Sequence, residues 1–275
     1  MAAYHVRSNS LPSTPHPFFS QIEINLGRIR ASEGTPSSLS SINHNLSGLQ
    51  DLHDCFEKLL LLPLTQRTLV QEEQPKWSDP LLDGSLRLLD VCSTAKDSLL
   101  QTKECTQELL PIIRRRGGVE TEAKKFLASR KVIKKAIHRA IGRLESMQKQ
   151  RELSSSNADQ ETMATVSMLR EVEAVTLNVF KSFLLLISGS KPQLKPSRWS
   201  AVSKLTHLQR AACKEENASE FGKVVGVLRS LCAVESVQNH LKILELCIQD
   251  LEGRIECLYR QMIKTRVSLL NTLSH

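Results

Sequence analysis

The chain has few aromatic residues and no long apolar run. Phe, Trp and Tyr make up 4% of its 275 residues, whereas apolar residues as a whole reach 40%. A membrane-spanning helix needs about 18 consecutive apolar residues, and the most apolar segments, 59–62 and 183–187, are much shorter. We therefore expect no transmembrane helix, and a leucine-rich core that favours helices over sheets.

Signals for strands and for secretion are also missing. No alternating run of β-branched residues occurs. The N-terminus lacks the apolar segment of a signal peptide, and the seven cysteines form no Cys-x-x-Cys pair. These features predict an intracellular, cytoplasmic protein with reduced thiols. The Ser-rich, acid-poor N-terminus is similar in composition to an organelle transit peptide, but Glu23 argues against that interpretation.

No recognisable catalytic or cofactor-binding pattern is present. No glycine-rich loop precedes a Lys-Ser or Lys-Thr pair, and the eight histidines lack a metal-ligand spacing. No signature supplies a base that would activate a Ser or Cys nucleophile. We therefore predict that the protein is not an enzyme and has no catalytic residues, no cofactor and no metal site. A deep pocket with converging polar groups would revive the enzyme hypothesis.

Helical periodicity is the strongest signal in the chain, and it is clearest near the C-terminus. From residue 234 onward, apolar residues recur at steps of three and four for about five heptads. These positions are Val234, Val237, Leu241, Leu244, Ile248, Leu251, Ile255, Leu258 and Met262. Only Thr265 interrupts the series before Leu269, and segment 233–270 contains no proline. The pattern predicts one long C-terminal helix that must bury its apolar stripe.

This final helix has two alternative roles, as the central element of a bundle or as one strand of a dimerising coiled coil. The residues beside the stripe do not form a charge-paired seam. Further apolar residues widen the stripe beyond a two-helix contact: Leu246, Ile263, Val267 and Leu270. We therefore favour burial within the same chain, while dimerisation and the oligomeric state stay open.

The rest of the chain repeats a pattern of helix, break and helix. The expected helices cover residues 38–62, 78–113, 119–150, 159–187, 199–213 and 217–232. Pro63 should end the first of them, Pro111 should kink or end the second, and residues 65–75 form a polar connection. The sequence thus predicts an all-α fold. Residues 38–275 form a single domain, a multi-helix bundle of six to seven long helices packed around the C-terminal helix.

Residues 1–37 are rich in Ser and Pro, and this composition predicts a disordered N-terminal tail. A short amphipathic helix fits within the tail, because five apolar residues fall on one side of it. They are Phe18, Phe19, Ile22, Leu26 and Ile29. Such a helix would dock on the body of the chain, on a partner or on a membrane surface, and docking on the body ranks first.

The same tail contains a candidate phosphorylation motif. Arg7 lies three residues before Ser10, a spacing that basophilic kinases prefer. The order of Arg7, Ser8, Ser10 and Pro12 also matches a docking pattern for 14-3-3 proteins, in which an arginine cluster captures the phosphate. Because short motifs also arise by chance, phosphorylation of Ser10 and 14-3-3 binding are hypotheses.

The net charge of +8 comes from one segment of the chain. Residues 114–151 contain 13 Lys or Arg and three Glu, a local charge of +10, so the remainder carries −2. Within helix 119–150 the cations spread over the half opposite the apolar face. The candidate residues for contact with an anionic surface are Lys124, Lys125, Lys131, Lys134, Lys135, Arg139 and Lys149.

This cationic helix has three interpretations. A solvated surface ranks first and an anionic membrane second, where each Lys or Arg contributes about 1 kcal/mol. Nucleic acid ranks third, because the face has no interleaved aromatic residues and the chain has no recognised nucleic-acid motif.

Four stretches of the chain are similar to one plant-specific family. They are His5-Val6-Arg7-Ser8-Asn9-Ser10-Leu11-Pro12, then Leu82-Asp83-Gly84-Ser85-Leu86-Arg87-Leu88-Leu89-Asp90, then Thr94-Ala95-Lys96-Asp97, and finally Ile248-Gln249-Asp250-Leu251-Glu252 through Lys264-Thr265-Arg266-Val267-Ser268-Leu269-Leu270-Asn271. In these stretches the chain resembles the BYPASS-like proteins. The resemblance implies a land-plant protein linked to root and shoot development, with no enzymatic activity and no ligand residues to transfer.

The expected function is therefore that of a non-enzymatic helical interaction protein with unidentified protein partners. The alternative is a peripheral membrane or trafficking adaptor that binds anionic surfaces through helix 119–150.

Overall fold

The computed structural model describes residues 16–33, 38–70, 77–115, 118–151, 160–190, 219–230 and 234–273. The side chains of residues 33, 147–151 and 160–163 are outside this description. The helices are α1 (Pro17–Glu33), α2 (Leu39–Leu60), α3 (Pro63–Val70), α4 (Ser78–Arg115), α5 (Val119–Arg151), α6 (Gln160–Ser188), α7 (Glu220–Ser230) and α8 (Val234–Leu273). No strand occurs among these residues, so the predicted all-α fold is confirmed.

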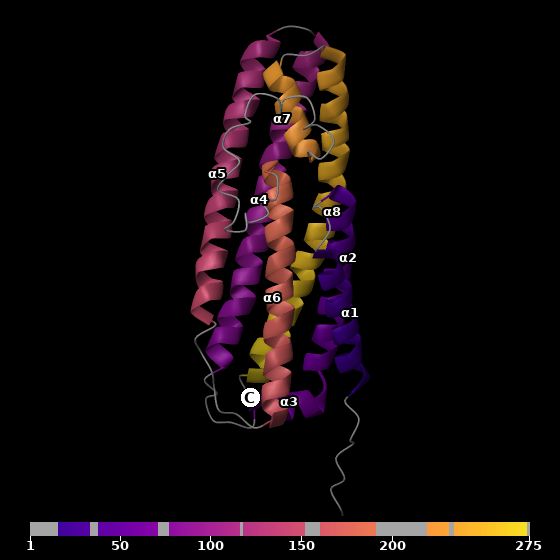
Figure 1. The fold of residues 1–275 in the computed structure, drawn as a ribbon, viewed down its shortest axis with the longest axis vertical. Helices are drawn as coiled ribbons and strands as arrows, with labels where there is room; N and C mark the ends of the chain where they lie inside the picture. The colour runs from indigo at the N-terminus through magenta and orange to yellow at the C-terminus, as the bar shows by residue number, and fades with distance from the viewer. Residues whose placement is uncertain are drawn as a thin grey trace, which may run out of the picture.

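The helices form an elongated bundle with its long helices along one axis (Figure 1). α8 packs against α4 and α2, with α7 near its beginning and α3 near its end. α4 also lies at the centre, because it contacts α5, α6 and α8. α5 forms one edge of the bundle, and α1 and α2 form the other (Figure 1).

The long C-terminal helix is present as predicted, with 40 residues in α8. Its apolar stripe is buried from Val237 to Leu269. Thr265, the residue that interrupts the apolar series, is buried as well. Its hydroxyl donates a hydrogen bond of 3.0 Å to the backbone oxygen of Gln261. The helix thus satisfies this polar group itself, and burial continues through the interruption.

The extra apolar residues of α8 do not lie where we predicted. Leu246 is 68% exposed, and Ile263, Val267 and Leu270 are exposed too. The prediction that they widen the buried face is therefore wrong. α4 and α2 cover the stripe from two sides and leave the back of α8 open to solvent, because neither α5 nor α6 reaches it.

The proline positions divide the chain only in part as expected. α2 ends at Leu60, and Pro63 begins the short helix α3, which extends to Val70 and so into the segment 65–75 expected to be a polar connection. Proline suits a first helical position, because its missing N–H would have no helical partner there. Pro111 does not end α4, which continues to Arg115 with Ile113 buried in its last turn. The helix expected at 199–213 lies outside the described residues.

α1 docks on the body of the chain, the option that ranked first. Ile22, Leu26 and Ile29 are buried, and α1 packs against α2 and α6. Two ion pairs add to this contact. Arg28 pairs with Asp51 of α2 at 2.8 Å, and Arg30 pairs with Glu171 of α6. The packed body thus includes residues before the predicted boundary at 38. The motif of Arg7, Ser8, Ser10 and Pro12 lies outside the described residues.

The end of α6 depends on a glycine. Gly189 has φ +66°, in the left-handed region, and its N–H donates to the backbone oxygen of Leu186 at 3.0 Å. A Cβ on Gly189 would also lie 3.2 Å from the backbone of Gly222 in α7. Glycine therefore ends α6 and lets the start of α7 pack directly against it.

α4 and α6 approach each other closely at Gly84. A Cβ on Gly84 would lie 2.2 Å from a carboxylate oxygen of Glu173 on α6. Glu173 is 3% exposed and forms an ion pair with Arg87 at 3.3 Å. The Asp83-Gly84 pair is a turn signal in other contexts, but here it lies inside α4. Glycine at position 84 leaves the space that the carboxylate of Glu173 occupies.

The crowded Gly84 and a helical glycine with open space around it, Gly142, give a matched prediction. Gly84→Ala should destabilise the protein by about 1–3 kcal/mol, because the methyl group overlaps a buried carboxylate. Gly142→Ala on α5 should stabilise it by about 0.5–1 kcal/mol, since no atom lies within 4 Å of the added Cβ. Urea unfolding monitored by circular dichroism measures both changes. Equal stability of the Gly84→Ala variant and the parent would contradict the close approach of Glu173.

Candidate functional site

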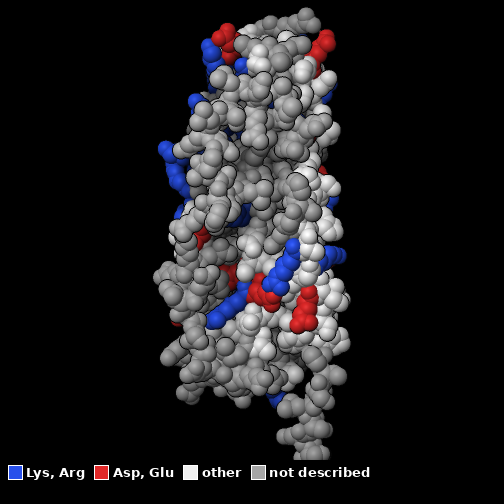
Figure 2. Space-filling view, in the orientation of Figure 1, with Lys and Arg blue, Asp and Glu red and all other residues white. Residues whose placement is uncertain are grey.

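The candidate site starts from the two unlike faces of α5. Its apolar residues are buried against α4, α6 and α7. They include Phe126, Ile133, Ile137, Ala140, Ile141 and Leu144. The cationic half of α5 is exposed. α5 forms one edge of the bundle in Figure 1, and Figure 2 shows Lys and Arg side chains projecting from this edge. α5 is thus an amphipathic helix with a cationic outside, as its sequence pattern indicates.

The seven predicted contact residues fall into three groups. Lys131, Lys134, Lys135 and Arg139 are exposed and form no ion pair among the described residues. We call these four residues the α5 cationic surface. The remaining predicted residues differ from them. Lys124 and Lys125 are exposed but pair with acids of their own helix, Glu120 and Glu122, each at 2.7 Å, and Lys149 belongs to α5 with its side chain outside the description.

One cation of this segment is turned inward. Arg130 is 5% exposed and donates hydrogen bonds to the hydroxyl of Thr102 at 2.8 Å and to the backbone oxygen of Ile187. Its guanidinium also lies 5.4 Å from the ring centre of Phe221. Burial lowers the pKa of Arg130 to about 10. Arg130 therefore joins α5 to α4, α6 and α7 and takes no part in the surface.

Sequence reasoning counted Arg130 among the segment's charges but did not place it inside. The signal was its spacing. Arg130 follows Phe126 by four residues and precedes Ile133 by three, so it falls on the apolar face.

A groove between α4 and α5 adjoins the cationic surface, and sequence reasoning missed it. It has a volume of about 660 Å³. α4 contributes Thr94, Asp97, Ser98 and Gln101, and α5 contributes Ile133, Ala136, Arg139, Gly142, Arg143 and Ser146. Of the six predicted residues whose side chains are described, only Arg139 lines it. The groove depends on the register between two helices, which periodicity within each helix does not contain.

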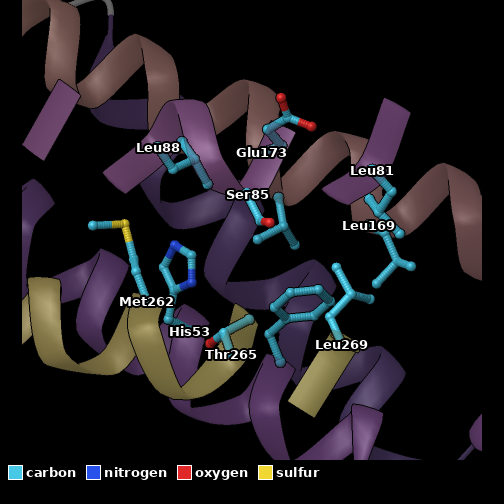
Figure 3. Close-up of a pocket in the computed structure, with 11 residues that line it drawn as sticks. His53, Leu81, Ser85, Leu88, Leu169, Glu173, Met262, Thr265 and Leu269 are labelled. Atoms are coloured by element: carbon cyan, nitrogen blue, oxygen red, sulfur yellow. The ribbon is translucent and has the colours of Figure 1, made fainter. Parts of the chain in front are cut away.

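A second cavity lies inside the bundle, between α2, α4, α6 and α8. Its polar residues are His53, Ser85, Glu173 and Thr265, and the remainder of the lining is apolar. In Figure 3 the ring of His53 lies beside Met262 and Thr265, while the carboxylate of Glu173 points away from it. The volume is about 30 Å³, enough for about one or two water molecules and far below the several hundred Å³ of a typical small-molecule pocket.

His53 is the unusual group in this cavity. The hydroxyl of Thr176 donates to the backbone oxygen of Val172 at 2.7 Å, so Nε2–H of His53 donates to that hydroxyl at 3.1 Å. The Nδ1 atom then has no hydrogen-bond partner among the described residues. Burial lowers the pKa of His53 from 6.5 to about 4, because a charged imidazolium would lose its hydration in this apolar setting.

This shift predicts a dependence of stability on pH. In acid the unfolded chain takes up a proton on His53 below about pH 6.5, whereas the folded chain does so only near pH 4. The free energy of unfolding should therefore fall as the pH decreases through this window, by about 3 kcal/mol in total. Urea unfolding between pH 7 and pH 4 measures the loss. His53→Gln should remove it, whereas His138→Gln, at an exposed histidine of α5, should not.

Among the described residues, two features are absent: a metal-binding cluster and a membrane-spanning helix. No group of three or more His, Cys, Asp or Glu side chains is placed to hold a metal ion. No helix in this part of the chain combines the length and the apolar character that crossing a membrane requires.

Comparison with known proteins shows the family. A family model described as Protein BPS1 matches residues 45–272, which is more than half of the chain. The chain belongs to the Protein BPS1 family. This confirms the resemblance to the BYPASS-like family of plants. No curated protein and no solved structure gives a significant match to the chain.

The match to the Protein BPS1 family begins inside α2 and ends inside α8. It therefore includes α5, the groove beside it and the cavity around His53. α1 and the motif around Ser10 precede it.

Proposed function

We propose that this member of the Protein BPS1 family is a non-enzymatic interaction protein acting in plant root and shoot development, and that it meets an anionic partner through the α5 cationic surface. One observation carries the proposal. Lys131, Lys134, Lys135 and Arg139 lie within about two turns of one helix, exposed and without ion pairs among the described residues.

Cations elsewhere in the bundle support this choice by contrast. Where α4 packs against α8, Lys96 pairs with Glu256 at 2.6 Å and Lys103 pairs with Glu252 at 2.7 Å. Such pairs neutralise the surface between these two helices. The acids of α5 lie near its two ends, at positions 120, 122 and 145, so its middle turns have no acid on the same helix.

The strength of the surface can be bounded. Four cations contribute about 4 kcal/mol against an anionic membrane, which corresponds to a dissociation constant in the millimolar range. Binding through these four residues alone is therefore weak and reversible. It is also sensitive to salt, since the Debye length is about 8 Å at physiological ionic strength. A stable complex needs a second contact.

A peripheral membrane or trafficking adaptor is the second candidate function, and one residue favours it. Val132 is 61% exposed at the edge of the cationic surface, three residues before Lys135 and therefore on the same side of the helix. An exposed apolar side chain among cations suits a lipid headgroup layer, which accepts both. It offers nothing to nucleic acid, for which stacking on aromatic side chains is the usual apolar contact.

Charge reversal tests the surface. The triple variant Lys131→Glu, Lys134→Glu and Lys135→Glu should reduce binding to vesicles containing phosphatidylserine at least tenfold at low salt, measured by co-sedimentation. The matched control reverses three exposed cations of α7 and α8: Arg229→Glu, Lys242→Glu and Lys264→Glu. Both variants have the same net charge, so an equal loss in both would contradict a specific role for α5. Failure of the parent protein to bind would end the membrane adaptor hypothesis.

The same two variants test the leading function in plants. In a line that lacks the protein, the α7 and α8 control should restore root and shoot growth, and the α5 variant should not. Full restoration by a folded α5 variant, with an unchanged circular dichroism spectrum, would overturn the proposal.

The motif before α1 supplies a second prediction about partners. A peptide of residues 4–16 phosphorylated on Ser10 should bind a 14-3-3 protein, because the phosphate adds nearly two negative charges opposite an arginine cluster. Fluorescence anisotropy measures the binding. The unphosphorylated peptide should bind at least tenfold more weakly. If the phosphorylated peptide does not bind, Ser10 is not a 14-3-3 docking site.

A further inference from the structure

The groove between α4 and α5 has two chemically different walls. α4 and α5 run antiparallel, and contacts of Arg130 with Thr102 and of Cys105 with Ser129 set their register. Beyond these contacts the helices leave the groove of about 660 Å³ between them. This volume lies within the range of clefts that bind small molecules.

The α5 wall is cationic and open. Arg139 and Arg143 are four residues apart and therefore lie on the same side of the helix. Neither forms an ion pair among the described residues. Ala136 and Gly142 also line this wall, and because they have little or no side chain they leave space in it. A Cβ on Gly142 would meet no described atom of another element within 4 Å. Two guanidinium groups without carboxylate partners suit a phosphate, which each can bind with two parallel hydrogen bonds.

The α4 wall is polar and able to accept hydrogen bonds. The hydroxyls of Thr94 and Ser98 donate to backbone oxygens of their own helix at 3.0 and 2.7 Å, so their oxygens remain acceptors. The carboxylate of Asp97 and the amide of Gln101 are exposed on the same wall. Asp97 repels a phosphate but accepts hydrogen bonds from hydroxyl groups. A ligand that matches both walls therefore has phosphate on one side and hydroxyls on the other.

We propose that this groove binds a phosphorylated polyol, with phosphate on Arg139 and Arg143 and with hydroxyls on Asp97 and Gln101. The proposal rests on the proposed function, because the groove adjoins the α5 cationic surface and supplies the second contact that this weak surface needs. A phosphorylated inositol has the required chemistry. It occurs as a lipid headgroup and as a free molecule, and the two sources are distinguished below.

The experiment compares three probes with the full-length protein. The first is vesicles that contain a phosphatidylinositol bisphosphate, set against phosphatidylserine vesicles of equal total charge. The second is free inositol trisphosphate, which keeps free hydroxyls beside its phosphates, and the third is pyrophosphate, which has no polyol. The parent protein should bind the phosphoinositide vesicles at least tenfold more tightly than the phosphatidylserine vesicles, and inositol trisphosphate more tightly than pyrophosphate. Co-sedimentation and isothermal titration calorimetry measure these affinities.

Two matched double variants separate the groove from the general surface charge. Arg139→Gln with Arg143→Gln should abolish the preference for phosphoinositide. Lys131→Gln with Lys134→Gln removes the same charge outside the groove and should weaken binding to both kinds of vesicle while keeping the preference. Asp97→Asn should weaken binding of inositol trisphosphate at least threefold but strengthen binding of pyrophosphate, because it replaces a charged acceptor of hydroxyl groups by a weaker neutral one and removes a repelling charge.

The outcomes separate this inference from the proposed function. Equal binding to both kinds of vesicle, with no preference for inositol trisphosphate over pyrophosphate, overturns the groove proposal and leaves the cationic surface in place. A preference that survives loss of both arginines also overturns it. Binding of inositol trisphosphate without any vesicle binding supports a free polyol phosphate and ends the membrane adaptor function. A preference for phosphoinositide vesicles over phosphatidylserine vesicles, together with a preference for the free inositol phosphate over pyrophosphate, supports a lipid headgroup as the ligand.

Discussion

The apolar stripe of α8 is the constraint on which the rest of the bundle depends. A helix of 40 residues cannot expose such a stripe to water, and α4 and α2 cover it along most of its length. α4 is thereby held at the centre of the bundle. One of its faces packs against α8, and other faces pack against α5 and α6. The position of the cationic helix at the edge of the molecule follows from this order of layers.

The distribution of charge follows from the same layers. Contacts between α4 and α8 place cations of one helix beside acids of the other, as in the pair of Lys103 and Glu252. α5 instead uses its apolar face for packing, and its outward half has acids only near its ends. Lys131, Lys134 and Lys135 thus have no carboxylate within reach among the described residues, and any neutralising charge comes from solvent ions or from a partner.

Particular residues show how far pattern reasoning extends. The spacing of Val237, Leu241 and Leu244 predicted their burial, because neighbours three and four residues apart share a helix face whatever the helix packs against. The same reasoning was wrong for Leu246 and Val267. Whether a second face is covered depends on how many helices surround α8, and this number is not contained in α8 itself.

By itself, the sequence determined the helical fold, the extent of the long helices and the amphipathic character of α5, since each depends on residues close together in the chain. Only the tertiary structure decided that Arg130 is buried, that Gly84 makes room for a carboxylate of α6, and that Arg139 lies across a groove from Asp97. These facts depend on the register and distance between helices. Those are set by the packing of side chains from distant segments, and no periodicity within one segment records them.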